Sequence, residues 1–136
     1  MANALYDKGR EKFLTGAISW SADTIKAVLV DAADYTVNLS THEFLSDVPS
    51  GARVATLASG LASKTTTAGV ADAADITFTS VTGDPSEALV LYKDTGSAAT
   101  SPLIAYIDTA TGLPVTPNGG DISVTWDNGS NKIFKL

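Results

Sequence analysis

From residue 53 to its end, this sequence alternates short apolar segments with clusters of turn-forming residues about every 8 to 12 positions. The clusters are rich in glycine, proline, aspartate and asparagine, as in "TGDPS", "DTGSAATSP" and "TGLPVTPNGG". Such regular spacing is typical of an all-β domain and leaves little room for helices. We expect strands over residues 24–31, 53–58, 61–68, 76–81, 88–93, 103–108, 122–126 and 132–136.

These segments show two kinds of strand pattern. The segments "IKAVLV", "ALVLY" and "LIAYI" are apolar throughout, as expected of strands that are covered on both faces. The segments "ITFTS" and "ISVTW" alternate, as expected of strands with one face in water. The mixture predicts two packed sheets, in an antiparallel β-sandwich. Jelly-roll and immunoglobulin-like sandwiches share these local signals, so the pattern leaves the strand order open.

The first residues predict a short helix. Asn3 can cap its start, and Gly16 is placed to end it. Leu5, Gly9 and Phe13 are spaced along one side of this helix. Gly9 weakens a helix by roughly 1 kcal/mol relative to alanine. We therefore expect the helix to be stable only when it docks on another part of the protein.

A second short helix is predicted over residues 40–47. Ser40 followed by Glu43 fits a capping box, in which each side chain accepts a hydrogen bond from a free amide of the first turn. Pro49 and Gly51 would end this helix.

The carboxyl terminus contains the strongest hairpin signal of the chain. Asn128 and Gly129 both tolerate the positive φ that a type I′ turn requires. The turn predicts that residues 132–136 fold back beside residues 122–126. The outer edge of this last strand would then be free to pair with another chain.

Length and charge limit the organisation and the partners. A chain of 136 residues without an internal repeat predicts one domain, with a helical segment over 1–16 and the β-sandwich over 17–136. The net charge is −6, with +1 on residues 1–16 and −7 on the sandwich. An acidic surface repels phosphate, so we expect no nucleic-acid partner. The sequence has no apolar run long enough for a membrane span or a signal peptide, which predicts a protein made in the cytoplasm without a membrane partner.

The reactive residues do not form a catalytic pattern. The chain has no cysteine and a single histidine, His42, which lies two positions from Ser40 and would point away from it on a helix. Two pairs of carboxylates lack the apolar surroundings of an acid catalyst: Asp72 with Asp75, and Asp84 with Glu87. We therefore expect no enzyme, no cofactor and no metal centre, with a weak calcium site at Asp72 and Asp75 left open.

The sequence resembles the cement, or head-decoration, proteins of tailed bacteriophages, and those of short-tailed phages in particular. The resemblance extends over nearly the whole chain, from "ALYDKGREKFLTGAISW" to its most specific parts, "LPVTPNGGD" and "ISVTWDNGSNKIFKL". It implies a jelly-roll sandwich that forms a homodimer. The dimer would bind the outer surface of the phage head and clamp neighbouring major capsid proteins of the HK97-like fold. The protein would then be located in the virion.

Two contact hypotheses follow from this resemblance. The first places capsid contacts in the N-terminal helix, through the apolar and basic side chains of Leu5, Tyr6, Lys8, Arg10, Lys12 and Phe13. Its alternative is that this helix only closes one end of its own sandwich. The second hypothesis places the dimer contact on the last strand, at Lys132, Ile133, Phe134 and Leu136. The competing function is a receptor-binding or carbohydrate-binding sandwich, for which aromatic residues exposed in the loops would be required.

Overall fold

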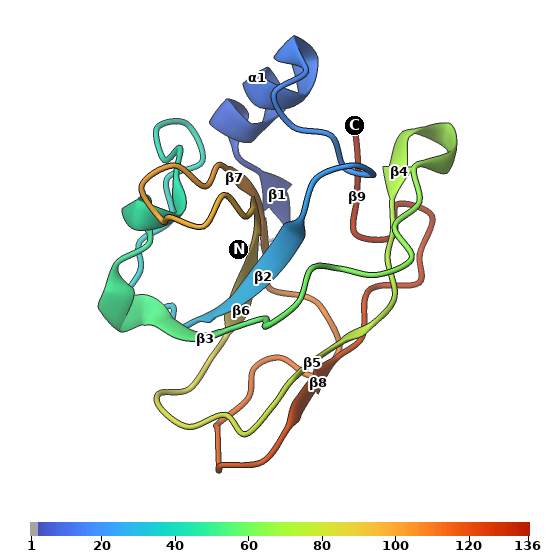
Figure 1. The fold of residues 1–136 in the computed structure, drawn as a ribbon. Helices are drawn as coiled ribbons and strands as arrows, with labels where there is room; N and C mark the ends of the chain where they lie inside the picture. The colour runs from blue at the N-terminus through green and yellow to red at the C-terminus, as the bar shows by residue number, and fades with distance from the viewer. Residues whose placement is uncertain (1–2) are drawn as a thin grey trace.

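The computed structural model describes residues 3–136, and it is mostly β with antiparallel strands, as the sequence predicts (Figure 1). Its single α-helix within these residues is α1 (Asp7–Thr15). The strands are β1 (Ala4–Leu5), β2 (Ile25–Val30), β3 (Arg53–Thr56), β4 (Val70–Ala71), β5 (Ile76–Phe78), β6 (Ala88–Lys93), β7 (Leu103–Ile107), β8 (Ile122–Val124) and β9 (Phe134–Lys135). Three 3-10 turns complete the list: η1 (Leu45–Asp47), η2 (Ser50–Ala52) and η3 (Thr67–Gly69).

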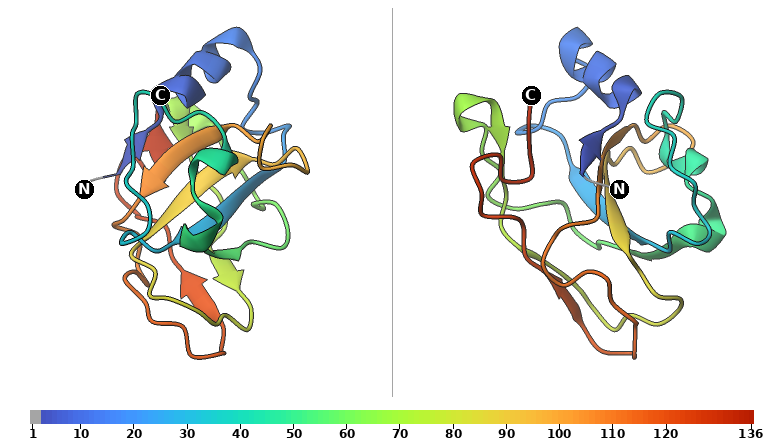
Figure 2. Two further views of the ribbon diagram at one scale, coloured as in Figure 1. Left: turned by 90° about the vertical axis from the view of Figure 1, so that its left-hand side faces the viewer. Right: turned by 180° about the vertical axis from the view of Figure 1, so that it is seen from behind.

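A five-stranded antiparallel sheet forms the centre of the molecule, in the order β1-β7-β6-β2-β3. One face carries the apolar cluster that it shares with the two-stranded pairs β4-β9 and β5-β8. The other face is covered by residues 35–52, which contribute to a second apolar cluster. Figure 2 (right) shows the sheet between these two layers. This double coverage explains why β2, β6 and β7 are apolar throughout.

The last strand does not pair as the hairpin signal predicts. β9 pairs with β4, and β8 pairs with β5, so residues 132–136 do not lie beside residues 122–126. Cross-strand apolar packing selects these partners, since Ile76 and Phe78 lie opposite Val124 and Ile122. The Asn128-Gly129 turn is present as a wider loop, in which the Lys132 amide donates to the Gly129 carbonyl.

The helix predicted over residues 40–47 is wrong apart from one 3-10 turn at its end, η1. The Asn38 carboxamide oxygen accepts hydrogen bonds from the amides at 40 and 41, which gives the backbone an alternative to the helix. Asp47 then accepts the amides of Glu43 and Phe44, at 2.7 and 3.0 Å. Ser40 is therefore not a helix cap.

Two further boundaries differ from the sequence prediction. Residues 61–68 form no strand, and the nearby strand is β4, which begins at Val70. The N-terminal helix begins at Asp7 instead of Asn3, because the Asn3 carboxamide accepts the amides of Asp108 and Thr109. The helix ends as predicted, with Gly16 in the left-handed conformation.

Candidate attachment face

The first and last strands of the described chain, β1 and β9, contribute to the lining of the same groove. α1, β1, β9 and the C-terminus lie in the upper half of the molecule as drawn in Figure 1. α1 packs closely against β7 because Gly9 has no side chain: a Cβ at this position would lie 2.5 Å from the Leu103 carbonyl oxygen. We call the end formed by α1, β1 and β9 the terminal face.

Two of the residues proposed as capsid contacts, Leu5 and Tyr6, are buried and do not reach the surface. Leu5 lies in β1 with its side chain in the core, and Tyr6 is fully buried. The Tyr6 hydroxyl is hydrogen-bonded to the Tyr35 hydroxyl at 2.8 Å. Burial, together with this hydrogen bond, raises the pKa of Tyr6 far above its usual value. The reason is that the chain enters the central sheet at β1 before the helix begins, which brings both side chains inside.

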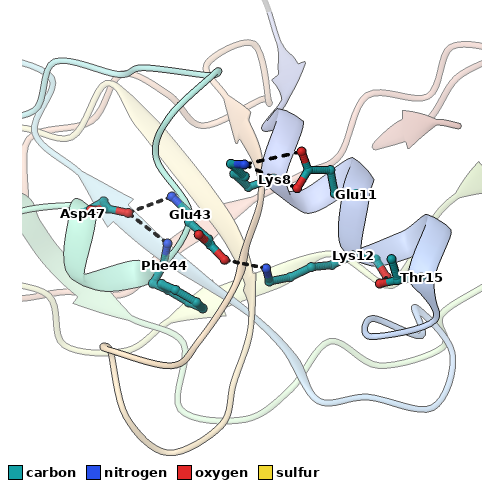
Figure 3. Close-up of polar contacts among 7 residues, drawn as sticks. All are labelled: Lys8, Glu11, Lys12, Thr15, Glu43, Phe44 and Asp47. Atoms are coloured by element: carbon teal, nitrogen blue, oxygen red, sulfur yellow. Dashed lines mark hydrogen bonds and ion pairs between the residues drawn. The ribbon is translucent and has the colours of Figure 1, made fainter.

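The three cations of α1 are all paired within the chain. Lys8 bonds Glu11 at 3.4 Å and Arg10 bonds Asp7 at 3.1 Å, both on the helix surface. Lys12 instead bonds Glu43 at 2.7 Å and lies over the Phe44 ring (Figure 3). Lys12 thus ties α1 to the segment that covers the central sheet, whereas Lys8 and Arg10 remain exposed.

Of the two large apolar residues exposed on the terminal face, the sequence analysis selected Leu136, for the dimer contact, and missed Leu14. Within residues 3–136, the large apolar side chains that remain exposed are Leu14, at 88%, and Leu136, at 61%. Phe13 is half-buried, with its ring 6.0 Å from that of Phe134. The helical spacing could have indicated that Leu14 is exposed, because Leu14 lies one turn after Arg10 on the charged side of α1.

The proposed dimer strand is partly internal. The side chains of Ile133 and Phe134 are buried, and the Phe134 ring packs edge-on against Trp20 at 5.2 Å. Lys132 donates to the Asn128 side chain at 2.7 Å and lies at the surface. The dimer contact therefore stays a prediction for Lys132, Leu136 and the backbone edge of β9. The side chains of Ile133 and Phe134 are no longer candidates for it, because they are buried.

A groove of about 300 Å³ separates β1 from β9. Its lining combines apolar residues of β1, β7 and β9 with polar and charged residues of α1, of β9 and of the loop before β9. A second, smaller hollow of about 80 Å³ lies at the β4-β9 pair, where Phe13, Trp20 and Leu136 contribute to its lining. The terminal face is therefore both hollowed and partly apolar.

His42 has a structural environment in the folded chain. Its Nδ1 is hydrogen-bonded to the Tyr35 hydroxyl at 2.8 Å, and the two rings are stacked. Burial raises the pKa of Tyr35 to about 12. His42, Tyr35 and Tyr6 thus form a continuous chain of hydrogen bonds from the surface to the core. This chain fastens the segment over residues 35–52 to the central sheet.

A group of carboxylates that the sequence analysis did not select comes together from two loops. Asp31, Asp34 and Asp84 each place one oxygen within 4.8 Å of the others. Oxygen ligands of this kind suit a hard cation such as Ca²⁺. Asp75, which the sequence analysis considered for calcium, accepts the Trp126 amide at 3.1 Å and fixes the end of β8. Only the fold reveals the first group, because its loops are far apart in sequence.

Among residues 3–136, no helix has the length and apolar composition that crossing a bilayer requires. A scan against models of protein families finds no match for this chain, and a search of curated protein sequences also finds none.

Proposed function

We propose that this chain is a structural head-decoration protein of a tailed phage. It would bind the outside of the head and clamp neighbouring major capsid proteins of the HK97-like fold against the pressure of packaged DNA. The observation that supports this most directly is the position of the two exposed large apolar side chains. Leu14 belongs to α1 and Leu136 follows β9, so both are part of the terminal face, and Leu136 contributes to the lining of its smaller hollow. Exposed apolar side chains on a hollowed face favour a surface that another protein covers.

The resemblance to cement proteins supports the finer parts of this proposal. They are the jelly-roll strand order, the homodimer, the virion location and the absence of catalysis. A homodimer with two terminal faces would gain about 10² to 10⁴ in avidity once its first half is bound. Each face can then bind weakly. Covering one leucine contributes about 1.5 to 3 kcal/mol, which is enough for a modest contact at each site.

The structure changes which residues we assign to the capsid contact. Phe13 is kept as an apolar anchor, and Leu14 and Leu136 replace Leu5 and Tyr6, which are both buried. Lys8 and Arg10 remain candidates for acidic capsid groups because they are exposed and only weakly paired. The competing carbohydrate-binding function has less support, because Trp20 and Trp126 are both buried and offer no stacking platform.

The test uses emptied, expanded phage heads from which the decoration protein has been removed. We expect the wild-type chain to co-sediment with these heads and to raise their melting temperature. The double variant Leu14→Ser with Leu136→Ser should bind about tenfold more weakly or worse, since it loses both apolar anchors. Leu113→Ser, in the loop between β7 and β8, is the control for the loss of a half-exposed leucine. Failure of the wild-type chain to bind, or full binding by the double variant, would contradict the proposal.

A further inference from the structure

The chain contains two asparagine–glycine pairs, Asn118-Gly119 and Asn128-Gly129. Such a pair can react with itself, because the glycine nitrogen can attack the side-chain carboxamide of the asparagine before it and close a succinimide ring. Glycine favours this attack, since it has no Cβ to crowd the ring and its backbone adopts the required conformation readily. Both pairs are exposed to water. Sequence and exposure alone therefore do not distinguish the two sites.

The fold holds the first pair in an unreactive arrangement. The Gly119 amide donates to the Val81 carbonyl at 2.7 Å, and the Val81 amide donates to the Gly120 carbonyl at 3.0 Å. The Asn118 carboxamide oxygen accepts the Gly120 amide at 3.0 Å. An attack by the Gly119 nitrogen would have to break its bond to Val81. A backbone carbonyl is also too weak a base to take up the proton that this nitrogen must lose.

The second pair has a different environment, in the loop that joins β8 to β9 (Figure 1). The Gly129 amide donates to a carboxylate oxygen of Asp127 at 3.2 Å. The Lys132 Nζ donates to the Asn128 carboxamide oxygen at 2.7 Å. The attacking nitrogen thus lies against a carboxylate, and the oxygen that becomes negative during the attack lies against a cation.

These two contacts match what ring closure requires. A carboxylate within about 2.6 to 3.2 Å of an N–H is positioned to accept its proton as a general base. A cation bonded to the carboxamide oxygen withdraws electrons from the carbon under attack and stabilises the charge that develops on the oxygen. The folded loop therefore brings a base, a nucleophile, an electrophile and a cation together.

We propose that Asn128-Gly129 is a self-modification site, at which the folded loop promotes conversion of the asparagine to aspartate and isoaspartate. The Gly129 nitrogen forms a bond to the side-chain carbonyl carbon of Asn128 and gives its proton to Asp127. The bond from that carbon to the amide nitrogen then breaks, and the amide group takes up the proton and leaves as ammonia. Water is the co-reactant of the last step: it opens the succinimide at one of its two carbonyls, which gives aspartate or isoaspartate.

The product differs from the original loop in charge and in backbone. The new carboxylate lies at a hollow of about 380 Å³ that Asp72, Asp75 and Asp127 also line, so the negative charge of this hollow increases. Isoaspartate in addition inserts a methylene group into the backbone between β8 and β9. Because ammonia is lost, the change is not reversed, and modified and unmodified chains differ permanently. This inference does not depend on the proposed head-decoration function.

The first experiment incubates the folded full chain at neutral pH and follows both asparagines by peptide mass spectrometry, with isoaspartate detected by enzymatic methylation. We expect Asn128 to convert about tenfold faster than Asn118. In chain unfolded by guanidinium, the two rates should agree within about threefold, because each pair then has only its local chemistry. Equal rates in the folded chain, or the same preference in the unfolded chain, would overturn the proposal.

The roles of the two neighbouring side chains are tested with variants. Lys132→Gln removes the cation and should slow the conversion of Asn128 roughly tenfold. Lys135→Gln is the matched control: it removes the same charge from β9, outside the loop, and should leave the rate within about twofold. Asp127→Ala removes the base and should slow the conversion about tenfold. The melting temperature checks that each variant is folded. An unchanged or faster rate in Lys132→Gln or in Asp127→Ala would overturn the proposal.

Discussion

Gly9 shows at the residue scale how a local cost can serve a tertiary contact. Glycine is unfavourable inside a helix, and the sequence alone indicates only a weak helix that must dock. In the structure, α1 lies so close to β7 that a Cβ at position 9 would overlap the Leu103 carbonyl. The absence of a side chain at Gly9 therefore both weakens the helix and allows it to pack closely on β7.

We predict that Gly9→Ala destabilises the protein although it favours the helix. Alanine gains about 1 kcal/mol of helix propensity. The added Cβ, however, would lie 2.5 Å from a backbone oxygen that has no flexible end to move, so α1 must shift away from β7. Overpacking of this kind costs about 1 to 3 kcal/mol. Urea denaturation measures the difference, and Gly51→Ala is the matched control, because a Cβ there meets nothing within 4 Å. Equal stability of the two variants would contradict this account.

Asp47 is a second residue whose role is local and testable. Partial burial acts to raise the pKa of its carboxyl, but hydrogen bonds from the amides of Glu43 and Phe44, with a smaller contribution from His42, hold that pKa below its usual value. A lowered pKa in the folded state means that the charged form stabilises the fold. This contribution is complete above about pH 5, which is one unit above the ordinary pKa of aspartate, and it is lost as the pH falls through the folded-state pKa.

Asp47→Asn should therefore lower the free energy of unfolding at pH 7 by about 1 kcal/mol, as the loss of a capping carboxylate does. The difference between wild type and variant should shrink as the pH falls from 5 to 3. Thermal unfolding across this range checks the prediction. Glu11→Gln removes an exposed carboxylate that, among residues 3–136, is paired with Lys8 alone, and it should have a much smaller effect. A constant difference at every pH would show that the charge of Asp47 is irrelevant.

At the element scale, β9 shows what local patterns can and cannot indicate. The alternation and the apolar residues near the C-terminus correctly predict an ordered strand. The sequence prediction assigns β9 the wrong partner strand, because a turn signal carries information only about the residues beside the turn. Ile133 and Phe134 instead reach the cluster around Trp20, and β4 supplies the matching edge.

We predict that Phe134→Ala costs about 3 to 5 kcal/mol of stability, since its ring is buried between Phe13 and Trp20. Leu136→Ala should cost well under 1 kcal/mol, because that side chain is 61% exposed. Denaturant unfolding compares the two variants directly. If both were nearly neutral, the C-terminal strand would not be part of the core.

At the scale of the whole molecule, the central sheet is covered by unlike layers. One layer consists of the strand pairs β4-β9 and β5-β8, and the other consists of residues 35–52, which contain little regular structure. The sequence predicts the double coverage from uniformly apolar strands, but it assigns residues 40–47 to a helix. Polar side chains, those of Asn38 and Asp47, decide the conformation of this segment by taking up its amides.

The sequence by itself determined the class of fold, the strongly apolar strands, and the end of α1 at Gly16. These features depend on side-chain alternation and backbone preference, which are properties of neighbouring residues. Only the tertiary structure decided that β9 pairs with β4, that Tyr6 is buried while Leu14 is exposed, and that β1 and β9 border one basic groove. Each of these depends on contacts between segments far apart in the chain, where the burial of apolar surface outweighs local signals.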